Sequence, residues 1–185
     1  LLLAGEDVET TNVRYSDRFR TVHFASSRGT YVLDERSLAT LHYRAIARDG
    51  DLVQSAHDGL SSVTSFDDLL GEEQKVRDVA RRAAALLKAP PCEGGTYTVI
   101  LDQELGGVFA HEAFGHLSEA DHLYENEKMR ELMHLGREMG TKSLHIVDDG
   151  SLPHLPGSLT VDDEGTPAGK TDLIRDKMLV GHLHS

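Results

Sequence analysis

Alternation of apolar and polar residues in one short segment constrains the fold of this chain most. In the segment 41–48, every second residue is apolar: Leu41, Tyr43, Ala45 and Ala47. Successive side chains of a strand point to opposite faces, so these residues are predicted to share one buried face. Asp49-Gly50 follows directly and favours a two-residue hairpin turn. Residues 51–57 are then predicted to return as the antiparallel partner.

A second hairpin and a helix are predicted on either side of this strand pair. Thr21–Ser26 and Thr30–Leu33 are strand-like, and Ser27-Arg28-Gly29 between them is turn-like. A helix is predicted over Gly71–Leu87, because apolar residues recur there at helical spacing: Val76, Val79, Ala80, Ala83, Leu86 and Leu87. Pro90-Pro91 prevents the helix from continuing.

The segment Lys88–Gly95 is the most linker-like part of the chain. It reads K-A-P-P-C-E-G-G, and its proline and glycine content is typical of a connection between domains. We place a domain boundary there. Residues 1–89 then form part of an N-terminal α+β domain, and residues 90–185 form part of a second domain.

The second half is predicted to alternate strands and helices. Strands are predicted at Thr96–Leu101, Ser143–Val147, Ser158–Val161 and Lys177–Gly181. Asp102 is predicted to cap a helix with Leu105, Val108 and Phe109 on its buried stripe. A second helix is predicted over Glu127–Met139, with Gly140 at its end and a core stripe of Met129, Leu132, Met133 and Met139. This order of elements predicts an α+β fold with a β-rich end.

Composition narrows the classes of partner and the compartment. Formal net charge is −12, which repels phosphate backbones and argues against a nucleic-acid partner. No apolar run is long enough to span a membrane, and Leu1-Leu2-Leu3 is too short for a signal peptide. A single cysteine precludes an internal disulfide and fits a reducing compartment, so we predict a cytoplasmic protein. Both ends of the chain are expected to be cut.

Metal chemistry is indicated by His111, Glu112 and His116, which form the pattern H-E-x-x-x-H. Imidazoles are good zinc ligands, and a glutamate beside one of them can serve as general base on a water held by the metal. The common zinc-peptidase motif, however, places its histidines at i and i+4 on one helix face. Here the second histidine, His116, lies at i+5 from His111.

This spacing predicts an irregular helix. Five residues of an ideal α-helix rotate by roughly 500°, so the two rings would point about 140° apart. A π-bulge would realign them, and Gly115 is a plausible place for it because glycine tolerates unusual backbone angles. We therefore predict a local distortion between His111 and His116. The alternative from spacing alone is a buried amphipathic helix that carries two ordinary histidines.

The segment Gly107–Asp121, reading G-V-F-A-H-E-A-F-G-H-L-S-E-A-D, closely resembles the signature helix of the TldD/PmbA family of zinc peptidases. Three further segments are similar to TldD-type sequence: Tyr124–Gly140, Gly157–Pro167 and Leu179–Ser185. The opening strands resemble, less specifically, the end of that family's N-terminal domain. The resemblance thus covers most of the chain and is specific from Thr96 onward. It implies that the second domain is the start of a β-rich C-terminal metallopeptidase domain.

The resemblance implies roles for the motif residues. His111 and His116 would be Zn2+ ligands and Glu112 the catalytic base. The substrates would be short or unfolded peptides, cleaved in a closed chamber built by two subunits. Family members pair as homodimers, or as heterodimers of an active subunit with a partner that lacks the motif. The family's third zinc ligand is a cysteine beyond this chain's end, to which Cys92 does not correspond, so the fragment alone is expected to be inactive.

Several other polar residues allow two interpretations. Glu119 could orient a ligand imidazole, or could be a solvated carboxylate or a cap. Asp162, Asp163 and Glu164 could bind calcium, but they lack the spacing of a known loop, and a solvated turn is favoured. Four further histidines show no mutual metal spacing: His134, His145, His182 and His184. His154 lies in a proline-flanked loop that could line a channel or simply connect strands.

Two competing functions remain beside a zinc peptidase. The first is a non-catalytic, peptide-binding or structural subunit that keeps the helix but holds no metal. The second is a truncated product or interaction module, whose exposed strands would pair with another chain.

Overall fold

The computed structural model describes residues 8–184 of the chain. They divide into two compact units that meet in sequence between Gly95 and Thr96, at the end of the predicted linker. The expectation for Leu1-Leu2-Leu3 lies outside the described residues. Among the described residues, no helix is both long enough and apolar enough to cross a membrane. The class is α+β, as predicted, because antiparallel sheets and helices occupy separate stretches of the chain.

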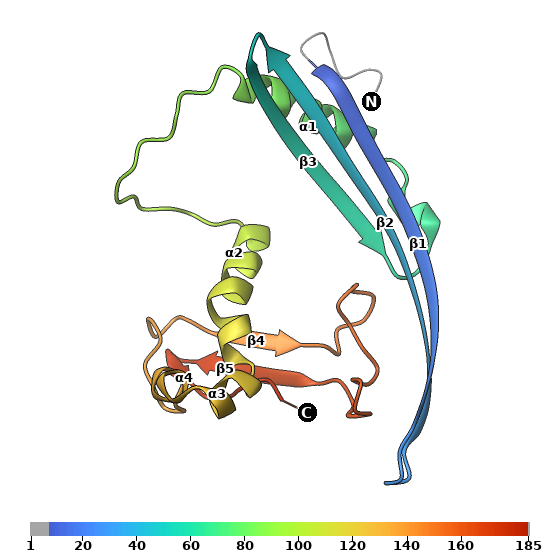
Figure 1. The fold of residues 1–185 in the computed structure, drawn as a ribbon, viewed down its shortest axis with the longest axis vertical. Coiled ribbons are helices and arrows are strands. Elements are labelled where there is room, and N and C mark those ends of the chain that lie inside the picture. Colours follow the sequence, from blue (N-terminus) through green and yellow to red (C-terminus); the bar gives the residue numbers. More distant parts are fainter. Residues whose placement is uncertain (1–7, 185) are drawn as a thin grey trace. The chain divides into compact units, whose positions relative to one another are not determined.

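The first unit contains a three-stranded antiparallel sheet of β1 (Val8–Ala25), β2 (Tyr31–Asp49) and β3 (Leu52–Ser62), in that order (Figure 1). Both predicted hairpins are confirmed. The two strands predicted at 30–33 and 41–48 are wrong as separate elements, because β2 runs through both. Its polar middle pairs with β1 without interruption, from Asp34 opposite Val22 to Thr40 opposite Ser16. Backbone hydrogen bonds to the long strand β1 thus extend β2 through residues whose side chains show no strand pattern.

The turn between β2 and β3 lies one residue later than predicted. Asp49 pairs with Leu52, so Gly50 and Asp51 form the two-residue loop. Gly50 has a φ of 57°, whereas Asp51 is not in the left-handed region. A positive φ at the first loop position favours glycine there, and this explains the shift.

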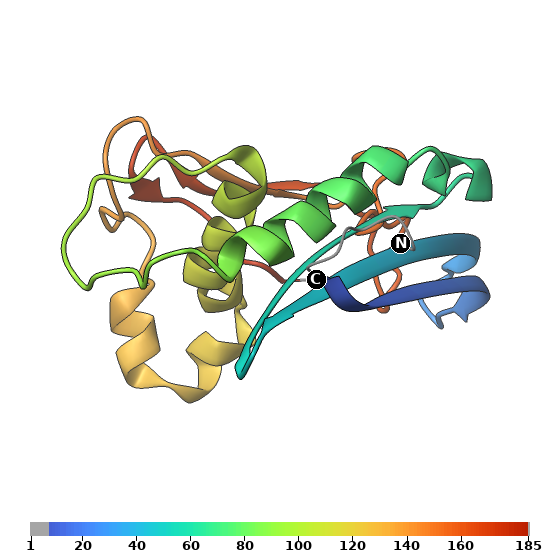
Figure 2. The same ribbon diagram turned by 90° about the horizontal axis from the view of Figure 1, so that it is seen from above.

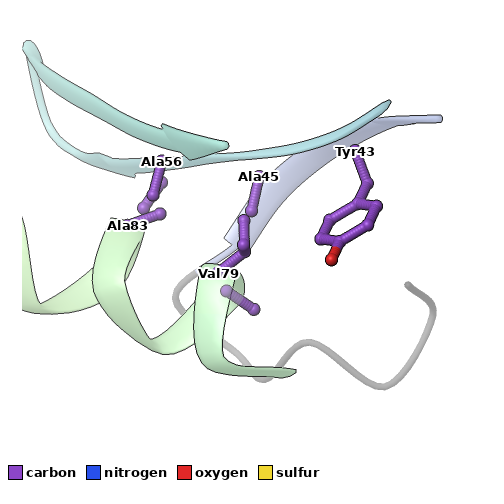
Figure 3. Packing of buried hydrophobic residues seen from close by; sticks show 7 residues of the cluster. Tyr43, Ala45, Ala56, Val79 and Ala83 are labelled. Carbon is purple, nitrogen blue, oxygen red and sulfur yellow. The ribbon is translucent and has the colours of Figure 1, made fainter. Parts of the chain in front are cut away.

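One helix covers a face of this sheet. The short η1 (Phe66–Leu69) leads to α1 (Glu73–Leu86), which lies along the sheet in Figure 2. The core between them contains Tyr43, Ala45, Ala47, Ala56, Val79, Ala80 and Ala83. Figure 3 shows Val79 and Ala83 of α1 facing Ala45 and Ala56 of the sheet. The predicted strand face is therefore confirmed, and Leu41 packs against the cluster. Leu86, at 41% exposure, is not on the buried stripe.

The second unit begins with a helical segment and ends with a small sheet. The helical elements are α2 (Gln103–Ala110), η2 (His111–Gly115), η3 (His116–Ser118), α3 (Asp121–Glu125) and α4 (Glu127–Leu132). The sheet is antiparallel and contains β4 (Ile146–Asp149), β5 (Lys170–Arg175) and β6 (Met178–Leu179). Met133, Ile174 and Leu179 form its core, and Phe114 and Leu117 of the helical segment pack against them. This packing anchors the motif-bearing segment.

The strand predicted at Thr96–Leu101 is wrong. These residues form neither strand nor helix, and Ile100 is 98% exposed. Within residues 8–184 no strand pairs with the segment, and an apolar sequence without a partner cannot form a sheet. The predicted buried stripe of α2 is wrong as well, since Leu105, Val108 and Phe109 are all more than half exposed.

The helix predicted over Glu127–Met139 ends at Leu132 instead. Beyond it, Gly136 N–H donates to the Leu179 carbonyl at 2.8 Å, and Met139 N–H donates to the Lys177 carbonyl at 2.7 Å. These tertiary hydrogen bonds replace the helical ones. The methionine stripe still belongs to the core, with Met133 buried and Met129 and Met139 packed against it.

The predicted strands of the β-rich end are only partly confirmed. The strand at Ser143–Val147 begins later, at Ile146, and that at Lys177–Gly181 shortens to Met178–Leu179. The strand at Ser158–Val161 is wrong, since it makes only a single bridge between Val161 and Pro167. Sequence reasoning missed β5, the central strand of this sheet.

Candidate metal centre

The helical segment that carries the motif starts where the sequence predicts. Asp102 is extended, and its side chain accepts a hydrogen bond from Leu105 N–H at 2.8 Å. This confirms Asp102 as the N-cap, which satisfies a donor that the first helical turn leaves unpaired. The backbone then continues as one helical segment through α2 and η2 into η3 (Figure 1).

The predicted distortion between the two histidines is confirmed. His111–Gly115 form a π-helical turn, in which His116 N–H donates to the carbonyl of His111, five residues before it. This hydrogen bond brings the two side chains together on one face. The ring centroids of His111 and His116 lie 4.5 Å apart, with the rings at 66° to one another. One potential ligand atom from each of His111, Glu112 and His116 lies within 4.8 Å of the others.

Gly115 supports this arrangement for a different reason than predicted. Its φ of −55° and ψ of −58° are ordinary right-handed helical values, so backbone freedom is not what the position needs. A Cβ at Gly115, however, would lie 3.2 Å from Nδ1 and 3.6 Å from Cγ of His111. The absence of a side chain therefore makes room for the His111 imidazole.

The residues present fit a divalent metal ion of the zinc type. Two imidazole nitrogens offer metal ligands, with the Glu112 carboxylate beside them, and imidazole is a preferred zinc ligand. All three side chains are exposed, so the buried position that the alternative expected for this helix is wrong. Zinc in a catalytic site binds three protein ligands and keeps one position open, so two histidines leave room for a further protein ligand.

The Glu119 carboxylate contacts the ring of the second histidine, His116. Its Oε1 is 3.0 Å from Nδ1 of His116, and its Oε2 is 3.5 Å from Nε2 of His122. The three side chains are each about half exposed. Of the two interpretations of Glu119, the contact with His116 matches the orienting one.

A surface cavity of about 480 Å³ adjoins the same histidine. Its lining comes from η3, α3 and the start of α4: His116, Leu117, His122, Glu125, Asn126 and Met129. Sequence reasoning singled out only His116 among the polar members. The helical spacing of His116, Glu119 and His122 at intervals of three is the signal that could have added His122.

The other candidate residues do not join the site. Asp162 Oδ1 accepts hydrogen bonds from the N–H groups of Glu164 and Thr166, which makes this segment a turn that its own backbone satisfies. His134 and His182 bond to backbone carbonyls of Glu131 and Met133. Cys92 is an exposed free thiol in the linker.

His145 contacts Asp172 rather than another histidine. Its Nε2 lies 3.1 Å from Asp172 Oδ1. The Arg175 guanidinium, which also pairs with Asp172, is the main reason that the pKa of this carboxyl lies below its usual range. His145, Asp172 and Arg175 thus form a surface cluster that includes none of the motif residues.

Both halves of the chain match sequence profiles of one family. Residues 94–185 match the PmbA/TldA metallopeptidase C-terminal domain, and residues 3–87 match the central domain of the same family. A metalloprotease from Synechocystis is 45% identical over 100% of this chain and 40% of its own length. A zinc metalloprotease TldD homolog from Saccharolobus solfataricus is 29% identical over 93% of this chain and 39% of its own length. The chain therefore spans about two fifths of the length of these relatives.

Solved structures share the fold. A protein from Thermotoga maritima described as a modulator of a DNA gyrase superposes with a TM-score of 0.78 at 23% identity, over 99% of this chain and 42% of that chain. TldE from Thermococcus kodakarensis gives a TM-score of 0.61 at 19% identity, over 94% of this chain and 38% of that chain.

Proposed function

Because this chain belongs to the PmbA/TldD family of metallopeptidases, we propose that it carries the metal-binding and catalytic helix of a zinc-dependent peptidase. The observation that supports this most directly is the π-helical turn, which brings His111, Glu112 and His116 together despite their unusual spacing. π-helical turns are rare and frequently mark functional sites, which supports a role for this one.

In this proposal the two histidines hold the metal and Glu112 does the proton transfer. Zinc, when bound, supplies a Lewis acid that polarises the scissile carbonyl and lowers the pKa of a water molecule. Glu112 accepts the proton of the attacking water, and can then pass it to the leaving amine as general acid. Its position next to His111 in sequence, with a carboxylate oxygen within 4.8 Å of both histidine ligand atoms, suits that role.

The wider setting of the reaction is also a proposal. We expect short or unfolded peptides as substrates, since a chamber between two subunits would exclude folded proteins. The partner would be a second copy of the protein or a related TldD/PmbA-type subunit. The third zinc ligand would come from residues outside this chain, which accords with the chain spanning only about two fifths of its relatives.

The test uses a protein that carries this chain together with the remaining length of its relatives. We expect about one zinc per chain by elemental analysis, and cleavage of an unstructured peptide that bears a fluorophore and a quencher. Glu112→Gln should keep the zinc and lose hydrolysis by a factor of about 100 or more, because it removes the proton acceptor but not a metal ligand. His111→Ala should lose both.

His134→Ala is the matched control, because His134 bonds to the carbonyl of Glu131 and lies outside the motif. It should leave zinc content and hydrolysis unchanged. Full hydrolysis in Glu112→Gln, or zinc retained in His111→Ala, would contradict the assignment. Absence of zinc from the longer protein would favour the non-catalytic subunit instead.

A further inference from the structure

We infer that Glu119 is a positioning residue of the metal centre, which holds the His116 ring so that Nδ1 carries the proton and Nε2 is left to bind the metal. The inference rests on the proposed metal site and adds to it a contact that determines which nitrogen of His116 binds the metal. It follows from how Glu119 is held and from what its two oxygens contact.

The contact with His116 selects one form of the ring. A neutral imidazole carries its proton on one nitrogen, and a metal binds the other. Glu119 Oε1 lies 3.0 Å from Nδ1 of His116, within hydrogen-bond reach. A carboxylate only accepts hydrogen bonds, so the pair is favourable only when Nδ1 carries the proton. The lone pair is then on Nε2, the nitrogen on the far side of the ring.

The backbone of Glu119 is fixed from outside the helix. Leu183 N–H donates to the Ser118 carbonyl at 2.7 Å, and Ala120 N–H donates to the Leu183 carbonyl at 2.9 Å. Glu119 and Leu183 thereby form a parallel β-bridge, and Ser118 is fully buried. The helical segment ends here because Glu119 is extended, with φ of −65° and ψ of 117°. The carboxylate thus projects from a braced position rather than from a frayed helix end.

The second oxygen of Glu119 is engaged as well. Oε2 lies 3.5 Å from Nε2 of His122, on the first turn of α3. A carboxylate with a second imidazole this close has less room to rotate than one with a single neighbour. His122 is therefore expected to support the contact with His116, with a smaller effect than Glu119 itself because its distance is longer.

An exposed contact between a carboxylate and an imidazole adds little stability, so the consequence lies in metal binding and not in folding. Partners of ligand histidines fix the tautomer and the ring orientation, and their removal typically weakens metal affinity by about 10- to 100-fold. Without Glu119, the His116 ring would sample both tautomers and rotate, and part of the population would present the wrong nitrogen.

The first test reads the tautomer directly, without metal. In the 15N-labelled 185-residue chain at about pH 8.5, where ordinary imidazoles are neutral, long-range 1H–15N spectra report which nitrogen carries the proton. The His116 signals are identified by their loss in His116→Ala. We expect mainly the Nδ1-protonated form in the unsubstituted chain and a shift to mainly the Nε2-protonated form in Glu119→Ala. Glu119→Gln should keep the first form, because the amide oxygen can still accept a hydrogen bond from Nδ1–H.

Glu125→Ala is the matched control. Glu125 lines the same cavity as His116, but no hydrogen bond joins the two within the part of the chain that the structure describes. It should leave the His116 spectrum unchanged. An Nε2-protonated His116 in the unsubstituted chain, or identical spectra for Glu119→Ala and the unsubstituted chain, would overturn the inference.

The second test measures zinc affinity by competition with a chromogenic chelator, using zinc alone and the longer protein that also supplies the third ligand. Glu119→Ala should weaken binding by about 10- to 100-fold, Glu119→Gln by less, and Glu125→Ala not at all. Equal affinity of Glu119→Ala and the unsubstituted chain would overturn the positioning role while leaving the peptidase proposal intact. If no variant binds zinc, the proposed metal site fails, and the spectra alone decide whether Glu119 sets the tautomer.

Discussion

At the scale of single residues, the metal centre depends on the contact between His111 and His116 and on the lack of a side chain at Gly115. The rings of His111 and His116 meet because a single π-helical hydrogen bond changes the phase of the helix between them. Gly115 lies inside this turn with ordinary helical angles. Its contribution is the space that the ring of His111 occupies.

Gly115→Ala should therefore disturb the metal site without unfolding the helix. The new Cβ would lie 3.2 Å from Nδ1 of His111, closer than ordinary contacts, and would push the ring from its place. We expect zinc affinity, measured by chelator competition, to fall on the order of tenfold. Alanine suits right-handed helical angles, so the helical circular dichroism signal should not fall.

Gly106→Ala is the matched control for this prediction. Gly106 lies in α2, and a Cβ there would meet nothing within 4 Å. It should leave zinc affinity unchanged and stabilise the helix by about 0.5–1 kcal/mol. Equal zinc affinities for both alanine variants would show that space at Gly115 is unimportant.

Tyr43 connects a single buried group to the pH dependence of stability. The side chain is 2% exposed, and burial, with the nearby Asp58 and Glu72 charges, raises the pKa of Tyr43 to about 12 from 10.0. As pH rises, the unfolded chain therefore loses the phenol proton at a lower pH than the folded chain does. Its contribution to stability is fully present below about pH 10 and is lost as pH rises through about 12.

Urea unfolding at pH 9 and at pH 11 tests this expectation. The free energy of unfolding of the unsubstituted chain should fall between these pH values by on the order of 1 kcal/mol more than that of Tyr43→Phe, which has no phenol to titrate. Other tyrosines and lysines titrate in both proteins and cancel in the comparison. An equal pH dependence in both proteins would mean that Tyr43 titrates normally in the folded state.

At the scale of elements, small side chains decide how closely α1 approaches the sheet. Ala45, Ala47 and Ala83 are fully buried at this contact, and Figure 3 shows Ala83 directed at the sheet. With so little side-chain volume in the interface, any added volume must displace backbone. The alternating pattern of β2 thus specifies which face is covered, and the alanines specify the distance.

Ala83→Leu should overpack this interface. We expect the free energy of unfolding by urea to drop by about 1–3 kcal/mol, because three extra carbon atoms must enter a filled space. Ala85→Leu, two residues further along α1 and exposed, should change it by less than about 0.5 kcal/mol. If both variants are equally stable, the helix does not pack as tightly as its alanines indicate.

At the scale of the whole molecule, each compact unit has its own apolar core. The core of the first unit lies between α1 and the long sheet, and that of the second surrounds Met133, Ile174 and Leu179. The chain between the units runs through residues 88–95, where every residue is exposed and none belongs to a helix or strand. Backbone of this kind is accessible to proteases, unlike backbone held in a sheet.

A glutamate-specific protease should therefore cut first after Glu93 among the sites within residues 8–184. Mass spectrometry at short digestion times should show one fragment ending at Glu93 and one beginning at Gly94. Glu93→Gln should delay the appearance of both. A first cut inside the sheet or inside α1 would contradict the division into two units at this linker.

Residue patterns alone determined much of the local structure and of the candidate site. The alternation through Tyr43 and Ala45 predicted the buried strand face, and Asp102 predicted the start of the motif-bearing helix. The spacing of His111 and His116 predicted the π-helical distortion, because helix geometry permits few other ways to align them. These features depend on residues close together in the sequence, so a sequence pattern can predict them.

The tertiary structure decided what depends on partners distant in sequence. Thr96–Leu101 has strand-like residues, yet no strand of the described residues pairs with it. Residues 136–139 have helix-compatible residues, yet hydrogen bonds to the backbone of residues 177–179 take them out of the helix. The bridge between Glu119 and Leu183, which braces the carboxylate behind His116, joins residues more than sixty positions apart. A backbone hydrogen bond carries no sequence signature of its partner, so local patterns could not foresee these contacts.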